Sequence, residues 1–298
     1  MSNKPEYLLT LGLPELFLNR YNLDLSDEIE RNIQYVEKDF AEKLGNLLEK
    51  EFDYHILTST EIEKRMKNLV AQSSGVPLIN LDDVYFQNLE CDRLSVTRLI
   101  ENLVNFNEKF LGARKGEPPL ESQIEKLSRK YSNKEVGLVD VGTFEGETLL
   151  DPKEGIIPNL IRYHIKPRKI FLSIVNKSAL KKLNQNGIEV IVNENIHDFS
   201  GGDWLESRDL LGFDGRKINC EKVGLNGRYH AFVRYIENSK TLKEGASITQ
   251  NVNEVLELCK NYNRKIMSLL QDNGIDVREG MLKGTSIYLI EFRDKKTN

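Results

Sequence analysis

The residues best suited to chemistry in this sequence gather in one stretch, 136–150, which reads V-G-L-V-D-V-G-T-F-E-G-E-T-L-L. An apolar run leads to the carboxylate of Asp140, and Gly142, Gly146 and the hydroxyl of Thr148 follow. A carboxylate can bind a metal ion, and glycine-rich turns expose backbone N–H groups that bind anions. This order is typical of a buried strand that delivers a ligand-binding turn to the carboxyl edge of an α/β sheet.

The segments after this stretch predict the elements that must position it. We expect a helix over Ile156–Ile165, a buried strand over Lys169–Val175, a helix over Ser178–Asn186 that Gly187 ends, and a strand over Ile188–Val192. Because parallel strands require crossover connections, this alternation of strands and helices predicts a parallel sheet.

The N-terminal part, residues 1–74, is predicted to be mainly helical. Ser26 is a good N-cap for a long amphipathic helix over 27–51, whose apolar residues recur every three or four positions. Thr58 and Glu61 then have the spacing of a capping box and predict the start of a second helix.

The segment between these helices and the opening stretch reads as strands and loops. Strand-forming residues predict at least one strand in each of 76–86 and 93–99, followed by a short helix over 100–110. Residues 111–119 are broken by glycine and proline, which predicts a loop, and a helix is expected from Leu120.

Beyond the alternating segment, residues 197–217 are rich in loop-forming, charged and aromatic residues, 253–271 predict an amphipathic helix and 285–292 a terminal strand. The fold class predicted is therefore α/β, with a parallel-sheet, Rossmann-like core and an added N-terminal helical region. We expect three regions, namely an N-terminal helical region at 1–74, the α/β core at 75–220, and a C-terminal helix-strand extension packed on the core at 221–298.

Composition excludes several classes of protein. The net charge of −4 and the pI near 5.8 argue against a nucleic-acid-coating protein, which usually has a basic face. Cys91, Cys220 and Cys259 form no C-x-x-C pair, so neither a disulfide framework nor a zinc site is suggested. No signal peptide is recognisable, and no window approaches the roughly 20 apolar residues of a membrane helix. We expect a cytoplasmic protein with no membrane partner.

Two common phosphate-binding turns do not fit the opening stretch. The P-loop pattern G-x-x-x-x-G-K-[ST] does not occur, and the dinucleotide pattern G-x-G-x-x-G fails because Gly142 and Gly146 are four residues apart. Two other families have turns that do fit.

The segment L-V-D-V-G-T-F-E-G-E-T-L resembles the diphosphosugar-binding loop of the type I phosphoribosyltransferases, a strand ending in acids followed by a small turn and G-x-T. The resemblance covers roughly residues 90–200. It implies a phosphoribosyltransferase-like fold that binds phosphoribosyl diphosphate or a nucleotide with Mg²⁺ and transfers the phosphoribosyl group to a base. It also implies that Asp140 faces the ribose hydroxyls, as the catalytic and metal-binding carboxylate.

The same resemblance implies how the phosphates are held. Backbone N–H groups around Glu145 to Thr148, with the Thr148 hydroxyl, would cradle the 5'-phosphate. The loop G-A-R-K-G-E-P-P, with Arg114 and Lys115, would cover the pyrophosphate. The loop residues implied to bind the ligand are Gly142, Thr143, Glu145, Gly146, Glu147 and Thr148.

Other residues are open to two interpretations. Trp204 and Arg208, in G-G-D-W-L-E-S-R-D-L-L, are suited to stack on and pair with a flat nucleotide, or they anchor a surface loop through an internal Arg-Asp pair. Asp82 and Asp83 either bind Mg²⁺ through water or are solvated at the end of a strand.

The remaining basic residues and histidines give weaker signals. Arg93 and Arg98 flank a predicted strand, where they either meet the pyrophosphate or pair with nearby acids. The histidines show no metal-ligand spacing, and His197 with Asp198 is the pair that merits the first test.

Two alternative functions stay open. D-V-G-T-F-E-G also resembles the D-x-G-x-x-x-G motif of S-adenosylmethionine-dependent methyltransferases, although the next strand ends in Asn176 rather than an acid. Val141, where the phosphoribosyltransferases have a second acid, together with Glu145 and Glu147, favours a non-catalytic, nucleotide-sensing relative. The oligomeric state is open, a homodimer included.

Overall fold

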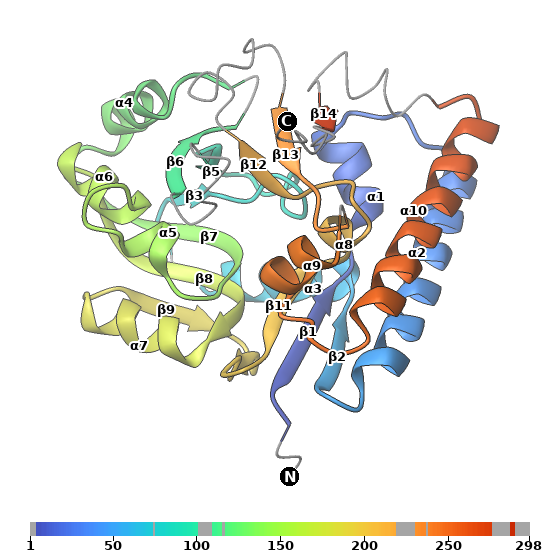
Figure 1. The fold of residues 1–298 in the computed structure, drawn as a ribbon. Helices are drawn as coiled ribbons and strands as arrows, with labels where there is room; N and C mark the ends of the chain where they lie inside the picture. The colour runs from blue at the N-terminus through green and yellow to red at the C-terminus, as the bar shows by residue number, and fades with distance from the viewer. Residues whose placement is uncertain are drawn as a thin grey trace, which may run out of the picture.

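The computed structural model describes residues 4–73, 75–100, 109–114, 117–218, 230–236, 238–275 and 287–289. Three sheets form the framework of this part of the chain (Figure 1). The strands are β1 (Glu6–Thr10), β2 (Asp53–Leu57), β3 (Leu78–Asn80), β4 (Asp92–Arg93), β5 (Val96–Ile100), β6 (Lys109–Ala113), β7 (Glu135–Thr143), β8 (Lys166–Asn176), β9 (Glu189–Val192), β10 (Ile196–His197), β11 (Asp203–Glu206), β12 (Arg216–Ile218), β13 (His230–Val233) and β14 (Ile287–Leu289). The helices are α1 (Leu13–Glu15), the π-helical η1 (Leu16–Arg20), α2 (Asp27–Leu48), α3 (Ser59–Val70), α4 (Leu120–Tyr131), α5 (Glu147–Leu150), α6 (Ile156–Arg162), α7 (Lys177–Gln185), α8 (Ser207–Leu210), α9 (Ser239–Ala246) and α10 (Val252–Asp272).

The central sheet has the strand order β10-β8-β7-β3-β4, β9 also pairs with β8, and every pairing is parallel. β7 and β8 are buried along most of their length, as expected for strands with helices on both faces. The prediction of an α/β protein with a mostly parallel, Rossmann-like central sheet is therefore confirmed. One detail is corrected, because Asp140 does not end its strand and β7 continues to Thr143.

Alternate residues of β7 and β8 face opposite layers of helices. Leu138 and Leu172 belong to a core formed with α4, α6 and α7, whereas Val139 and Phe171 belong to a second core formed with α3. The helices expected after residues 120, 156 and 178 are present as α4, α6 and α7. They hold β7 rigidly in the middle of the sheet, where its carboxyl end can position a ligand.

The N-terminal region is mainly helical, as the sequence predicts, but it also contains two strands that the sequence analysis did not predict. α2 and α3 form as expected, and Thr58 and Glu61 make the predicted capping box. However, β1 is the middle strand of a separate parallel sheet, the N-terminal sheet, with the order β11-β1-β2. Residues 7–10 are all buried in this sheet. The local sequence does not predict β1, because its partner strand β11 lies far along the chain.

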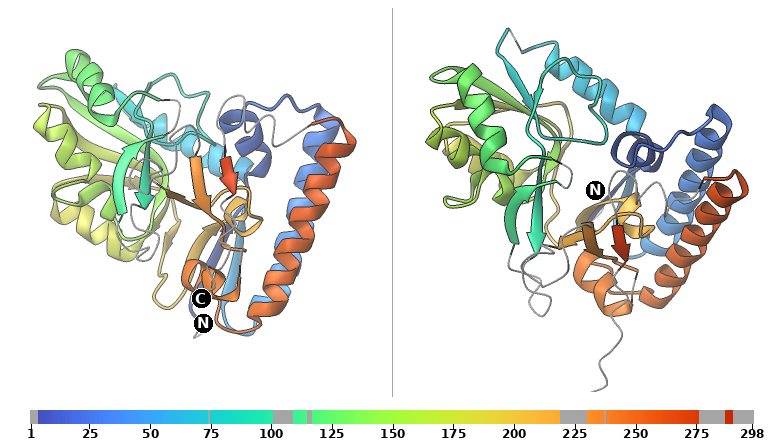
Figure 2. Two further views of the ribbon diagram at one scale, coloured as in Figure 1. Left: turned by 45° about the horizontal axis from the view of Figure 1, so that its top comes forward. Right: turned by 90° about the horizontal axis from the view of Figure 1, so that it is seen from above.

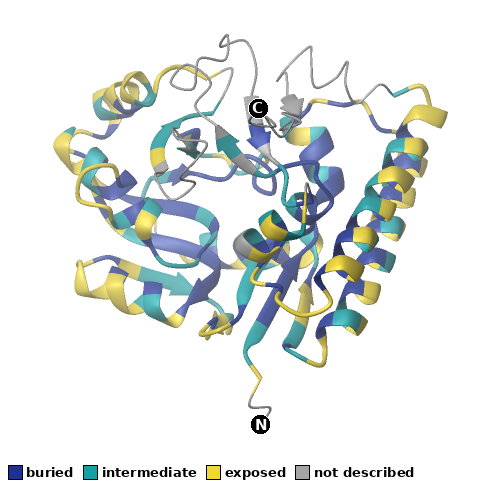
Figure 3. Ribbon diagram, viewed as in Figure 1, coloured by how far each residue is buried: buried dark blue, intermediate teal, exposed yellow. Residues whose placement is uncertain are grey.

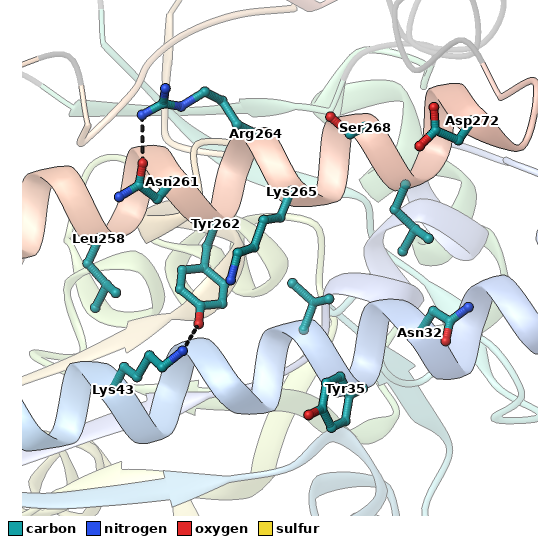
Figure 4. Close-up of a pocket in the computed structure, with 12 residues that line it drawn as sticks. Asn32, Tyr35, Lys43, Leu258, Asn261, Tyr262, Arg264, Lys265, Ser268 and Asp272 are labelled. Carbon is teal, nitrogen blue, oxygen red and sulfur yellow. Dashed lines mark hydrogen bonds between the residues drawn. The ribbon is translucent and has the colours of Figure 1, made fainter.

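α10 packs along α2 at the side of the molecule away from the central sheet (Figures 1 and 2). At this contact, Lys43 Nζ donates to the Tyr262 hydroxyl over 2.7 Å, and Lys265 Nζ lies 4.0 Å from the centroid of the Tyr262 ring (Figure 4). A hollow of about 960 Å³ lies between the two helices. None of the residues predicted to do chemistry lines it, and the exposed Tyr35 stands at its wall.

The third sheet has the order β14-β13-β12-β5-β6. The helix expected over 100–110 is not confirmed at its ends, because Ile100 lies in β5 and Lys109 and Phe110 lie in β6, which pairs with β5 in antiparallel fashion. Residues 101–108 lie outside the described part of the chain. β14 falls within the strand expected at 285–292, whose other residues are not described. Burial is concentrated in the central strands and on the inner faces of the helices (Figure 3). In the described ranges, no helix combines the length and the apolar character that crossing a bilayer requires.

A buried carboxylate ties the helices to the N-terminal sheet. Glu37 on α2 accepts hydrogen bonds from the backbone N–H groups of Gly12 and Leu13, both at 3.0 Å, and from the Ser207 hydroxyl. Burial raises the pKa of Glu37 to about 7, against the lowering effect of the hydrogen bond from Ser207. The nearby carboxyl of Glu15 adds to the rise.

We expect Glu37→Gln to change how stability depends on pH. A carboxyl with a raised pKa in the folded protein stabilises it below the unfolded pKa, and this contribution is lost as the pH rises through about 7. Glutamine does not titrate and keeps an acceptor for the two amides. Urea unfolding should therefore show the variant gaining up to ~3 kcal/mol on wild type between pH 5 and pH 8.

Glu42→Gln on the exposed side of the same helix is the matched control. Its difference from wild type should stay constant over the same pH range. A constant difference for Glu37→Gln as well would show that Glu37 does not titrate between these values.

Candidate ligand-binding site

A cavity of about 450 Å³ lies at the carboxyl end of β7, where the three sheets meet. We call it the first cavity. Its walls come from β7, the following loop and α5, from β11 and α8, from β5 and α9, and from the residues just after β3, β6 and β13. The residues that line it are Asp82, Arg98, Arg114, Asp140, Val141, Gly142, Thr143, Phe144, Thr148, Leu149, Asp203, Trp204, Leu205, Glu206, Arg208, Asp209, Tyr235 and Gly245.

Two carboxyls from neighbouring strands face this cavity. Asn80 pairs with Val139 in the parallel register of β3 and β7, which brings Asp82 beside Asp140 at the same edge of the sheet. Burial, and after it the neighbouring Asp82 carboxylate, raise the pKa of Asp140 to about 7. Asp82 also accepts the backbone N–H groups of residues 84–86.

Sequence reasoning singled out Asp82 but did not place it in this site, and expected it to be solvated or to hold Mg²⁺. Its position directly after a predicted strand could have indicated that it belongs to this site, because the carboxyl ends of neighbouring parallel strands lie at one edge of the sheet. Solvation at a strand end is the wrong interpretation, since Asp82 and Asp83 are both buried.

The loop after β7 reaches the cavity through Phe144 and Thr148, and its acidic side chains do not line the cavity. Gly146 has a φ of 77°, a left-handed conformation that glycine adopts without strain, and α5 begins directly after it. Glu145 turns away from the cavity to Lys182, with 2.9 Å between Oε2 and Nζ. Phe144 stacks on Phe199 with the ring centroids 5.3 Å apart.

Gly142 allows a close approach between the central and N-terminal sheets. A Cβ at this position would lie 2.7 Å from the backbone oxygen of Ile174 and 2.8 Å from Cη2 of Trp204. The Trp204 indole is held in turn by Thr10, whose hydroxyl accepts its Nε1–H over 3.3 Å. Trp204 therefore forms a fixed wall of the first cavity.

Arg98 and Thr148 meet across the cavity. Nε of Arg98, on β5, donates to the hydroxyl of Thr148, which follows the loop. The Arg98 side chain is 36% exposed, so part of its guanidinium is open to solvent. The Glu147 carboxylate lies 3.7 Å from Nη1 of Arg98 and is 67% exposed, so it points outward.

A buried ion-pair network stands behind the cavity, centred on Asp83. The Asp83 carboxylate binds Arg20 with two hydrogen bonds, at 2.8 and 2.5 Å, and Nη1 of Arg114 lies 2.8 Å away. Burial alone would raise the pKa of Asp83, but Arg114 and Arg20 outweigh burial and hold it far below its usual range. Arg20 also donates to Asp214. Arg114, predicted for the pyrophosphate loop, is thereby anchored at the cavity wall.

Arg208 is buried between charged and aromatic neighbours. It donates through Nη2 to Glu206, its Nε lies 3.7 Å from Asp214, and its guanidinium lies 5.6 Å from the centroid of the Tyr85 ring. Its side chain thus pairs with these acids and not with Asp209, the partner expected for an internal Arg-Asp pair.

The structure brings most of the predicted site together. Asp140, Gly142, Thr143, Thr148, Arg114, Trp204 and Arg208 all line the first cavity. Glu145, Gly146 and Glu147 flank it through the loop, and Lys115 lies outside the described residues.

The other candidates lie elsewhere. His197 binds Glu6, with 2.9 Å between Nδ1 and Oε2, and Asp198 binds Lys177 rather than His197. Arg93 approaches Asp83 at 3.9 Å and lines neither this cavity nor the one beside it. Nowhere in the described part of the chain do three or more His, Cys, Asp or Glu side chains form a group that could hold a metal ion.

No protein-family model matches the chain, and no curated protein matches it. Among solved structures, the crystal structure of TT1426 from Thermus thermophilus is similar at 14% identity. The alignment covers 45% of this chain and 81% of that one, with a TM-score of 0.27. A similarity of this size supports no conclusion about fold or function.

We expect Asp83→Asn to be strongly destabilising. The amide removes the negative charge that holds two buried guanidinium groups, and breaking one partner of a buried ion pair costs about 3–5 kcal/mol. Chemical denaturation at pH 7 would measure the loss.

Asp92→Asn is the matched control, because Asp92 pairs with the exposed Lys130 near the surface. It should cost no more than about 1 kcal/mol through that pair. Equal losses in the two variants would show that the Asp83 network contributes no more than a surface pair.

Proposed function

We propose that the protein binds phosphoribosyl diphosphate, or a related nucleotide, in the first cavity and transfers the phosphoribosyl group to an acceptor. The observation that carries the proposal is the meeting of Asp140, its neighbour Asp82, Thr148, Arg98 and Arg114 around one cavity at the carboxyl end of β7. These residues come from separate segments, and they supply the groups that a phosphorylated sugar needs.

The charges of the cavity divide along its walls. Asp82 and Asp140 stand where the ribose hydroxyls would lie, because carboxylates accept hydrogen bonds from hydroxyls. Thr148, with Arg98 beside it, stands at the end of the loop where the 5'-phosphate would lie. Arg98 and Arg114 would neutralise the charge that develops on the departing pyrophosphate.

The acidic residues of the loop do not oppose a phosphate there. Glu145 is paired with Lys182, and Glu147 is exposed beside Arg98, so neither carboxylate lines the cavity.

Mg²⁺ fits this arrangement as a companion of the diphosphate. Magnesium keeps several waters and needs only one or two carboxylates besides the phosphates. Asp140 and Asp82 would hold it, directly or through water. Its chemistry would be to neutralise the phosphate oxygens, while the residues of the cavity orient the sugar.

We expect phosphoribosyl diphosphate with Mg²⁺ to bind measurably in isothermal titration calorimetry at pH 8, and Asp140→Asn to weaken binding about tenfold or more. The amide cannot accept both ribose hydroxyls as a carboxylate does. Affinity should fall as the pH drops from 8 to 6, because Asp140, with a pKa of about 7, becomes protonated.

Asp151→Asn is the control for this titration. Asp151 is exposed just after α5, lines neither cavity, and should leave the affinity unchanged. No heat with phosphoribosyl diphosphate and Mg²⁺, together with binding of S-adenosylmethionine, would overturn the proposal and favour a methyltransferase. Binding without turnover of any base would favour a nucleotide sensor.

A further inference from the structure

A second cavity, of about 390 Å³, adjoins the first one. It extends toward Arg20, Asp214 and Lys217, beyond the residues that we assign to the sugar and its phosphates. The two cavities share the wall formed by Arg98, Arg114, Glu206, Arg208, Asp209 and Tyr235.

Arg208 brings an unsatisfied donor to this shared wall. Its side chain is only 6% exposed, and its Nε and Nη1 atoms hydrogen-bond to no other group in the described part of the chain. A buried N–H without an acceptor costs about 1–3 kcal/mol, and more in a charged group. A ligand oxygen placed against Arg208 would recover that cost.

Asp209, the next residue of α8, brings a half-buried acceptor. Its carboxylate makes no hydrogen bond and no ion pair with another described residue, yet it lines both cavities. Burial and the neighbouring Glu206 raise the pKa of Asp209 to about 6, so the group is mainly a carboxylate at neutral pH. A ligand N–H would satisfy it.

We infer that the second cavity binds a small dipolar ligand that carries a carboxylate for Arg208 and an N–H donor for Asp209. Basic and acidic side chains share the walls of the second cavity, namely Arg20, Arg98, Arg114, Arg208 and Lys217 beside Glu206, Asp209 and Asp214, and such mixed walls suit a ligand that carries both a carboxylate and an N–H donor. The inference rests on the proposed function in one respect only, namely that this ligand would be the acceptor of the phosphoribosyl group.

Pyrrole-2-carboxylate is a suitable probe, because its ring N–H lies beside its carboxylate. Titration followed by ligand-observed NMR should show binding at pH 7.5. Pyrrole-2-carboxamide lacks the charge and should bind about tenfold more weakly, as expected for losing a hydrogen bond to a charged group. 1-Methylpyrrole-2-carboxylate lacks the N–H and should be weakened by a similar factor.

Two variants assign each contact to its residue. Arg208→Lys keeps the charge beside Glu206 but removes the planar guanidinium donors, so the preference for carboxylate over carboxamide should fall. Asp209→Ala removes the acceptor, so it should abolish the preference for the N–H probe over its methylated form. Arg168→Lys, at an exposed pair with Glu135, is the matched control and should leave both preferences intact.

Several outcomes would overturn the inference. These are the absence of binding by pyrrole-2-carboxylate, equal affinity for all three probes, or preferences that survive both variants, as they would if only water fills the cavity. If Arg208→Lys does not fold, the three probes with wild type and Asp209→Ala still decide the matter.

A parallel titration with phosphoribosyl diphosphate and Mg²⁺ separates this inference from the proposed function. Binding of the diphosphate without the dipolar probe would overturn only the inference. Binding of the probe, with both preferences, but not of the diphosphate would overturn the proposed function and leave a site for a dipolar ligand.

Discussion

The ion pairs of Arg20 and Arg114 with the buried carboxylate of Asp83 are the interactions on which the site depends most. Arg20 comes from η1 near the N-terminus, Arg114 from the end of β6, and Asp83 from the segment after β3. An isolated charge at any of these buried positions would be very costly, so each group needs the others. This network fixes the third sheet and the N-terminal segment against the carboxyl edge of the central sheet.

The two cavities at the carboxyl edge of the central sheet differ in chemistry because different elements line them. The first cavity is built where β3 and β7 end, and parallel register places Asp82 beside Asp140 there. The second is built from α8 and the third sheet, where Arg208, with two buried N–H groups that lack an acceptor in the described part of the chain, stands beside the carboxylate of Asp209. A sugar with phosphates fits the first set of groups, and a smaller dipolar molecule fits the second.

The elements that were predictable from the sequence are those with a local signal. The apolar runs of β7 and β8 and the capping box at Thr58 sit beside the residues that they organise, and all three are present. β1 was missed because its pairing with β11 links distant segments. Asp82 was not placed beside Asp140 for the same reason, since strand order decides which strand ends become neighbours. The loop acids Glu145 and Glu147 looked repulsive in sequence, but their orientation depends on Lys182 and on solvent.

Hydrogen–deuterium exchange of the peptide covering residues 142–150 would test the proposed site most directly. With phosphoribosyl diphosphate and Mg²⁺ at pH 8, the amides of residues 144–148 should exchange more slowly, because they would donate to the 5'-phosphate. Mg²⁺ alone should not produce this protection. Unchanged exchange in this peptide at saturating diphosphate, or protection confined to another part of the chain, would contradict a phosphate site in the loop after β7.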